Sequence, residues 1–586
     1  MVKFRKRMEG SRQLDPTGCA AAGRDWIAAL ALLLVLGLTA PAVRGQSLPS
    51  NADPLPAIRQ HAAAEQWDEV VHLAESVPAR SAGLNYYYGM ALARLGRWDE
   101  ARTAFLAGHQ LQPQDPRFPV ELGGVNFLQK RYPEAAVWLR RALRLDSDDT
   151  YANDLLATVY FMQGNLEAAL KYWNRVGKPH VAAVRVVPQL RVRPSLLDRA
   201  FAFSPASSLR LPDLLTSDVR VRALGIFPTH TFDLAACPDN RFDVIFRAQE
   251  RNGWGSGKWQ ALVSTFRGIF YQTVTPEYSN LGRSAVNLSA LIRWDTEKRR
   301  LQAAMSRPLR ADAKWRYRIV LDLRNENWDI RNPSSNPAPL LAGLNLRREA
   351  AGVEITSFSS GRWQWSAGAE LSHRDYRGLT GAAPSELLLS GYALKHLARV
   401  NYEWLRVPEH RLVARAALRS QIGTLWSQPR HGFAKVQATV ETHWLPRARG
   451  DDYENRLQLR AGMIFGRVPF DELFMLGVDR DNDLWLRAHA ATHNGRNGNA
   501  PLGRRYFLAN WEMDKNVYRN GLFTFKLGPF FDTGKITDSS PLLGPKAWLV
   551  DTGVQAKAGV LGVQVLFSYG KDLRTGRNVF YVTTAR

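Results

Sequence analysis

Apolar and polar residues alternate with a period of two through the C-terminal half of the chain. Residues 363–372 place Trp, Trp, Ala, Ala and Leu on one face and Gln, Ser, Gly, Glu and Ser on the other, and residues 286–294 and 435–444 repeat the pattern. Successive side chains of a β-strand point to opposite faces, whereas an amphipathic helix has a period of 3.6. From residue 254 onward we therefore expect two-faced strands.

These strands are predicted to close into a barrel. After residue 45 the chain has no uninterrupted apolar stretch of about 18 residues, which excludes helical membrane spans. Trp and Tyr are frequent on the apolar faces and near segment ends, as in the aromatic girdles of outer-membrane barrels. Residues 253–586, at roughly 20 residues per strand and turn, give an expected outer-membrane β-barrel of about 16 strands. A soluble β-sandwich is the alternative.

The N-terminus has the pattern of a secretory signal peptide. Six basic residues precede an uncharged run over residues 26–43, and small residues near positions 40–45 suit cleavage. We predict a signal peptide over residues 1–45, with an uncleaved membrane anchor as the alternative. Cleavage would remove Cys19 and leave only Cys237, so an internal disulfide and a multi-cysteine zinc site are excluded.

A period of 34 residues runs through residues 51–180. Such a period predicts stacked helix pairs, in which small residues recur where two helices cross and bulky ones fill the groove beside them. The predicted packing residues are Gly89, Gly123 and Ala157, then Ala101, Ala135 and Ala169, then Phe105, Leu139 and Trp173. This region resembles the tetratricopeptide repeat, which implies a concave surface for a peptide or protein partner. A simple stalk is the alternative.

A different pattern occupies residues 181–252. Its segments read as strand, helix, helix, strand and strand, with Leu224-Gly225-Ile226-Phe227 before the second strand. This order resembles one polypeptide-transport-associated (POTRA) domain. A linker subdomain is the alternative.

The most specific motifs lie late in the chain. A Pro469-Phe470-Asp471-Glu472-Leu473-Phe474 segment precedes a long polar stretch with Leu486-Arg487-Ala488-His489, and Asn510-Trp511-Glu512 and Phe530-Phe531-Asp532-Thr533-Gly534 follow. This order resembles the bacterial surface-antigen superfamily of BamA, TamA and two-partner secretion transporters.

In that family an Arg of an inward-folded loop contacts an acidic residue of a Phe-x-Asp-x-Gly strand. The resemblance implies a loop clamp between Arg487 and Asp532, with Glu512 as a second partner and Phe530 and Gly534 completing the strand motif. Ala488 and His489 depart from the family's Gly and aromatic residue. Surface loop charge without a partner is the alternative.

The net charge of +24 is concentrated in the barrel and the segment before it. Residues 1–45 contain seven Lys and Arg against three Asp and Glu, and residues 51–180 contain 14 against 15. The remaining +21 lies in residues 181–586, where it fits a lumen and anionic lipid headgroups rather than nucleic acid.

No nucleotide-binding, hydrolase, zinc-protease or EF-hand motif occurs in the chain. His489 and His493 are interpreted as polar loop residues rather than metal ligands. We therefore expect neither enzymatic activity nor a cofactor or metal.

The sequence thus predicts an α+β multidomain protein of the Gram-negative outer membrane. Its periplasmic part would hold a helical tetratricopeptide solenoid and a small POTRA-like α/β domain, and its C-terminal part a transmembrane antiparallel barrel. By resemblance it would assemble or translocate client polypeptides, with periplasmic accessory proteins and outer-membrane lipid or lipopolysaccharide as further partners. A polysaccharide exporter and a surface-lipoprotein translocator are the alternatives, and the client's identity stays open.

Overall fold

The structure is a computed structural model. It describes residues 54–586 apart from 238–240, 255–267, 269–271, 332–337, 383–384, 428, 447–451, 520–522, 539, 541–542, 544–546, 561–562 and 586, and apart from the side chains of residues 560, 563, 584 and 585. The predicted signal peptide over residues 1–45, with Cys19, lies outside the described residues. Among the described helices, none combines the length and the hydropathy needed to cross a bilayer.

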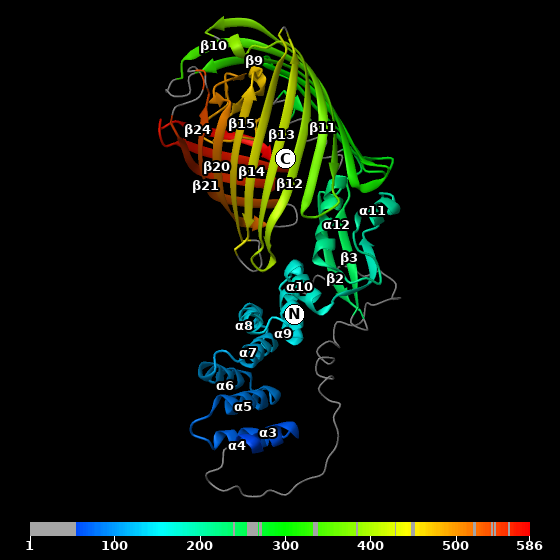
Figure 1. The fold of residues 1–586 in the computed structure, drawn as a ribbon, viewed down its shortest axis with the longest axis vertical. Coiled ribbons are helices and arrows are strands. Elements are labelled where there is room, and N and C mark those ends of the chain that lie inside the picture. The colour runs from blue at the N-terminus through cyan, green and yellow to red at the C-terminus, as the bar shows by residue number, and fades with distance from the viewer. Residues whose placement is uncertain are drawn as a thin grey trace. The chain divides into compact units, whose positions relative to one another are not determined.

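The described chain forms two compact units (Figure 1). The first contains the residues up to Val187, Phe203–Arg210 and Thr231–Arg247. The second contains Pro188–Ala202, Leu211–His230 and Ala248–Arg586. Residues 181–252, the predicted small domain, are thus divided between the two units.

The first unit begins with four consecutive helix pairs. These helices are α3 (Leu55–Ala63), α4 (Trp67–Glu75), α5 (Ala82–Arg94), α6 (Trp98–Leu111), α7 (Arg117–Leu128), α8 (Tyr132–Leu145), α9 (Thr150–Met162) and α10 (Leu166–Trp173). Side-chain caps mark three of the N-termini, where Ser81 accepts from the Leu84 amide, Asp149 from the Ala152 amide and Asn165 from the Ala168 amide.

The 34-residue period places its residues at the contacts within each pair. Ala101, Ala135, Ala169, Ala157, Phe105 and Leu139 are fully buried, and Trp173 is buried. A Cβ atom built on Gly123 would lie 2.5 Å from Leu139 Cγ, and one built on Gly89 would lie 2.6 Å from Phe105 Cε1. Glycine is therefore required there by close packing, because a side chain would overlap the partner helix.

A three-stranded sheet completes the first unit. Its strands are β1 (His180–Val187), β2 (Thr229–Ala236) and β3 (Arg241–Gln249), in the order β1-β3-β2, with β1 parallel to β3. The rings of Trp173 and Phe242 lie 5.4 Å apart, so the last repeat helix packs on this sheet. Helices α11 (Pro194–Ala200) and α12 (Leu211–Leu224) lie between β1 and β2 in the chain. The elements therefore follow the predicted order of strand, helix, helix, strand and strand.

The second unit is dominated by one antiparallel sheet that curls into a barrel (Figure 1). Counting β5 and β6 as one interrupted strand gives sixteen strands in the described residues: β4 (Gly253–Trp254), β5 (Thr273–Val274), β6 (Glu277–Leu281), β7 (Val286–Trp294), β8 (Lys298–Leu309), β9 (Asp312–Arg331), β10 (Leu340–Ser357), β11 (Trp363–Gly381), β12 (Gly391–Val407), β13 (Leu412–Trp426), β14 (His431–Trp444), β15 (Tyr453–Gly466), β20 (Arg505–Arg519), β21 (Phe523–Thr537), β22 (Leu549–Val560), β23 (Val563–Asp572) and β24 (Asn578–Ala585). The predicted fold class, a helical repeat region followed by an antiparallel barrel, is confirmed.

The barrel strands have their apolar face outside and their polar face inside, the opposite of a soluble protein. On β11 the apolar face is outside, where Trp363 is 43% and Leu371 46% exposed. The polar face is inside, where Ser372 is 1% and Arg374 0% exposed. The alternation seen in the sequence therefore separates an apolar exterior from a charged interior.

The helix contacts of the repeats lead to a prediction with an internal control. We expect Gly123→Val to destabilise the repeats by about 1–3 kcal/mol through overpacking against Leu139. Gly124→Ala lies in the same helix, and no atom beyond the backbone and chain neighbours of that helix lies within 4 Å of the added Cβ, so it is expected to be neutral or stabilising by up to about 1 kcal/mol. Thermal unfolding of the helical signal at 222 nm measures both, and equal midpoints for the two variants would contradict the packing described.

Candidate functional site: a loop clamped inside the barrel

The connection between β15 and β20, residues 467–504, folds into the barrel. It forms a short 3-10 helix, Phe470–Glu472, and the small strands β16 (Phe474–Met475), β17 (Thr492–His493), β18 (Arg496–Asn497) and β19 (Leu502–Gly503). Apolar side chains drive this folding, because Phe470, Leu476 and Leu486 are buried in a cluster with residues of β9, β10, β20 and β21. Strand β18 also pairs with β9.

Arg487 lies at the centre of this loop and binds Asp532 of β21. Its Nε donates to Asp532 Oδ2 at 2.9 Å, and its Nη2 donates to Asp532 Oδ1 at 2.7 Å. The backbone amide of Arg487 also donates to Oδ2, at 3.1 Å. Arg487 is 4% and Asp532 0% exposed, so this is a buried bidentate ion pair.

Other barrel residues complete the surroundings of Arg487. Its Nη1 donates to Glu512 Oε2 at 3.1 Å and to Gln555 Oε1 at 2.7 Å. The guanidinium carbon lies 3.9 Å from the centre of the Phe530 ring. Asn510 Nδ2 donates to Asp532 Oδ1 at 2.7 Å.

The structure thus brings together the predicted Arg487, Asp532, Glu512 and Phe530. Gly534 lies two residues further along β21 than Asp532. A Cβ atom added to Gly534 would lie 3.2 Å from Leu508 Cδ1 and 3.3 Å from Leu476 Cδ1. Gly534 therefore gives room to apolar side chains near the clamp.

The two residues after Arg487 bind the next two strands. The amide of Ala488 donates to Asp551 Oδ2 of β22 at 2.7 Å. His489 Nδ1 lies 3.1 Å from the same oxygen, and its Nε2 lies 3.7 Å from Asp572 Oδ2 of β23. Asp532, Asp551 and Asp572 are opposite one another in the strand register, so three consecutive loop residues follow one row of carboxylates.

Within the described residues, His489, Asp551 and Asp572 are close enough together to hold a metal ion. Both ring nitrogens of His489, however, face carboxylate oxygens of the barrel wall. This arrangement suits a histidine that donates to the wall, so we assign the group to loop attachment. His493, in contrast, is exposed.

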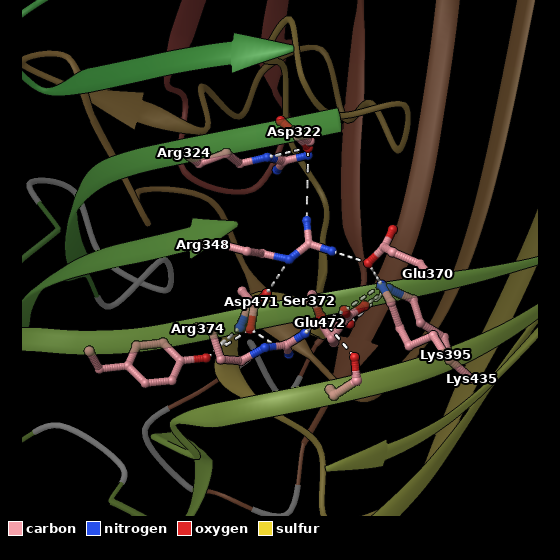
Figure 2. A network of polar contacts seen from close by, with 12 residues as sticks. Asp322, Arg324, Arg348, Glu370, Ser372, Arg374, Lys395, Lys435, Asp471 and Glu472 are labelled. Atoms are coloured by element: carbon pink, nitrogen blue, oxygen red, sulfur yellow. Dashed lines mark hydrogen bonds and ion pairs between the residues drawn. The ribbon is translucent and has the colours of Figure 1, made fainter. Parts of the chain in front are cut away.

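A second attachment lies at the start of the loop (Figure 2). Asp471 Oδ1 accepts from Arg374 Nη1 at 2.9 Å and from the Tyr376 hydroxyl at 2.8 Å. Glu472 Oε1 accepts from Lys395 Nζ at 2.8 Å, and the Glu472 carbonyl accepts from Lys435 Nζ at 2.8 Å. These partners come from β11, β12 and β14.

Arg348 of β10 joins this attachment to further strands (Figure 2). Its guanidinium lies 3.4 Å from Asp471 Oδ2 and 3.9 Å from Asp322 Oδ2, and it also binds Glu370. A continuous polar network therefore crosses β9, β10 and β11.

A third attachment fixes the middle of the loop to β7 and β8. Asp481 accepts from Arg293 Nη1 at 2.8 Å and from Arg300 Nη1 at 2.7 Å. Asp479 lies 3.4 Å from Lys298 Nζ. The loop is thus bound at three places on different parts of the wall, an arrangement that holds a segment inside the lumen.

The sequence motifs identified Arg487, Asp532 and Glu512 but missed most of the remaining attachments. Asp471 and Glu472 lie in one of those motifs without a predicted role, and Asp551 and Asp572 were not singled out. In the sequence, such residues stand out only as charged residues at inward positions of alternating strands. Their contacts can be predicted only when the register between the strands is known.

The repeats present a second candidate surface on α5 and α7. Arg117 lies 4.8 Å from the centre of the Tyr86 ring, and Glu121 lies one helical turn after Arg117 on α7. Burial raises the pKa of Tyr86 to about 12, and burial also raises the pKa of Glu121. Tyrosine, arginine and a protonation-prone carboxyl group together suit contacts with a polypeptide.

Arg487 offers a test of the clamp with a control in the same loop. Arg487→Gln leaves the buried Asp532 without its cation, and we expect a loss of about 3–5 kcal/mol in barrel stability. Arg496→Gln removes a more exposed pair with Glu297 and Asp329, and we expect a loss below about 1 kcal/mol. The measurement is the temperature at which heat-modifiable migration of the folded barrel is lost in gel electrophoresis.

The double variant Arg487→Gln/Asp532→Asn separates pairing from general damage. If the two residues act as a pair, the double variant loses less than the sum of the single variants. Strict additivity, or an Arg487→Gln barrel as stable as Arg496→Gln, would show that the ion pair does not brace the barrel.

Comparisons with known proteins agree with the repeats and add similar barrel structures. A family model described as "Tetratricopeptide repeat" matches residues 61–116 and 89–150. No curated protein matches the sequence. Solved structures to which the chain is similar include BamA from Haemophilus ducreyi lacking POTRA domains 1–3, with 12% identity, a TM-score of 0.42 and coverage of 69% of this chain and 84% of that one. They also include CdiB from Escherichia coli, with 12% identity, a TM-score of 0.43 and coverage of 70% of this chain and 75% of that one. A third is CdiB from Acinetobacter baumannii, with 12% identity, a TM-score of 0.41 and coverage of 79% of this chain and 86% of that one.

Proposed function

We propose that this protein is an outer-membrane translocation or assembly factor for polypeptides. Its repeats and small sheet would receive a client in the periplasm, and its barrel would insert or export that client. The observation that carries the proposal is a barrel with an apolar exterior whose lumen holds an inward loop bound through Arg487 and Asp532.

The faces of the barrel support the membrane part of the proposal. Ile319 and Trp404 on the outside are 47% and 52% exposed, whereas Asp532 and Asp551 on the inside are fully buried. In water this exterior would favour aggregation, but in a bilayer it faces hydrocarbon while the charged residues stay in the lumen. The interior ion pairs would be costly on a lipid-facing surface.

The N-terminal unit supports the polypeptide part. Stacked helix pairs form extended binding surfaces, and the face containing Tyr86, Arg117 and Glu121 offers aromatic and charged contacts. In the sheet order β1-β3-β2, β2 is an outer strand with an edge to which an extended segment can add. Both surfaces are suited to a protein chain, and the late sequence motifs resemble a family that handles such chains.

An anionic polysaccharide exporter is the second candidate. The observation in its favour is the basic excess of residues 181–586. A surface-lipoprotein translocator would share the repeats and the barrel.

Depletion of the protein from its host, followed by outer-membrane and secretome proteomics, tests the proposal. We expect a specific set of barrel or secreted proteins to fall at least several-fold, and complementation with the unaltered gene to restore them. Loss of a surface polysaccharide with an unchanged proteome would contradict the proposal, as would loss of surface lipoproteins alone.

A further inference from the structure

Three arginines lie in one row of inward positions across the barrel wall. The register aligns Arg316 of β9, Thr356 of β10, Ser366 of β11, Arg399 of β12, Arg419 of β13 and Gln437 of β14. The row contains hydrogen-bond donors and no acidic residue. We call Arg316, Arg399 and Arg419 the arginine row.

The arginine row has neutral hydrogen-bond acceptors as its partners. Arg316 Nη2 donates to the Ser306 hydroxyl at 2.6 Å, and Arg399 Nε donates to Asn401 Oδ1 at 3.1 Å. Arg419 Nε donates at 3.2 Å to the side-chain oxygen of Gln421 when the Gln421 amide is turned so that its oxygen faces Arg419. These acceptors are neutral, whereas Arg374 and Arg487, two of the cations that hold the loop, bind carboxylates.

Arg399 and Arg419 are also direct cross-strand neighbours. Like charges directly opposite each other destabilise a sheet. Both side chains are exposed, although they project from the inward face. Water screens part of their repulsion, and a bound anion would remove more of it.

The row lies toward the end of the barrel where α12 makes its contacts. Arg220 Nε of α12 donates to the Phe358 carbonyl, in the short connection between β10 and β11, at 3.1 Å. Gly225, just after α12, has a φ of +68°, and a Cβ atom there would lie 3.3 Å from both terminal nitrogens of Arg316. The Leu224 carbonyl accepts from Asn287 Nδ2 of β7 at 2.9 Å. The turn after α12 therefore lies beside Arg316, at one end of the arginine row.

We infer that the arginine row binds the carboxylates of an acidic stretch in an extended client polypeptide. This inference rests on the proposed function and names the chemistry of the client. Guanidinium groups bind carboxylates through two parallel hydrogen bonds. Arginines on neighbouring barrel strands are about 4.8 Å apart at the backbone, and side chains on one face of an extended client repeat every ~6.8 Å. Because arginine side chains are long, two neighbouring arginines can bind client carboxylates that are two residues apart. The hydroxyls of Thr356 and Ser366 add neutral donors between them.

Binding of labelled deca-glutamate to the folded full-length protein in detergent tests this inference. By fluorescence anisotropy at low salt, we expect Arg399→Gln/Arg419→Gln to bind at least tenfold more weakly than the unaltered protein. The matched control is Arg347→Gln/Arg377→Gln, which removes one exposed arginine from β10 and one from β11. These arginines pair with Glu349 and Asp375, and their loss should leave deca-glutamate binding unchanged. Heat-modifiable migration verifies that each variant is folded.

A charge reversal keeps the test decisive if the double variant does not fold. Arg419→Glu should weaken deca-glutamate binding and strengthen deca-lysine binding. Unchanged deca-glutamate binding in either folded variant would overturn the inference, as would tighter binding of polygalacturonate oligomers than of deca-glutamate to the unaltered protein. Depletion proteomics tests the proposed function independently of these binding results. If depletion lowers client proteins but deca-glutamate binding does not depend on the arginine row, only the present inference is disproved.

Discussion

The buried ion pair between Arg487 and Asp532 is the interaction on which the interior of the barrel depends. A guanidinium and a carboxylate removed from water are costly unless the two groups satisfy each other and their remaining hydrogen bonds are made. Here the pair is bidentate, and Glu512, Gln555, Asn510 and the Arg487 amide supply further contacts. Because every partner is on a strand except Arg487 itself, the pair fixes the loop with respect to the wall.

The same reasoning explains why the loop has several attachments. Charged residues that point into the lumen cannot be covered by the apolar exterior, so their partners must come from other strands or from the loop. Asp471 and Asp481 provide the carboxylates for Arg374, Arg293 and Arg300. The loop therefore neutralises much of the lumen, and the arginine row is a place where its carboxylates do not reach.

Local sequence patterns were sufficient for the faces of the strands and for the contacts of the repeats. Alternation in residues 363–372 identified the outward Trp363 and the inward Ser372, and the 34-residue period identified Gly123 and Leu139. The clamp was found through short motifs, because Arg487 and Asp532 are 45 residues apart and no local rule connects them. Asp551, Asp572 and the arginine row depend on the hydrogen-bonded register between strands, which a single sequence does not encode locally. The division of residues 181–252 between two compact units likewise follows from contacts across long separations.

Cysteine accessibility at the loop tip tests the central claim that the loop is held inside the barrel. Ala488 is fully buried, and its amide donates to Asp551 of the wall, whereas His493 in the same loop is exposed. In a chain with Cys237→Ser, Ala488→Cys should resist a maleimide added to the folded protein in detergent and react only after heat denaturation, whereas His493→Cys should react in the folded protein. Equal labelling of the two positions in the folded protein would contradict the account.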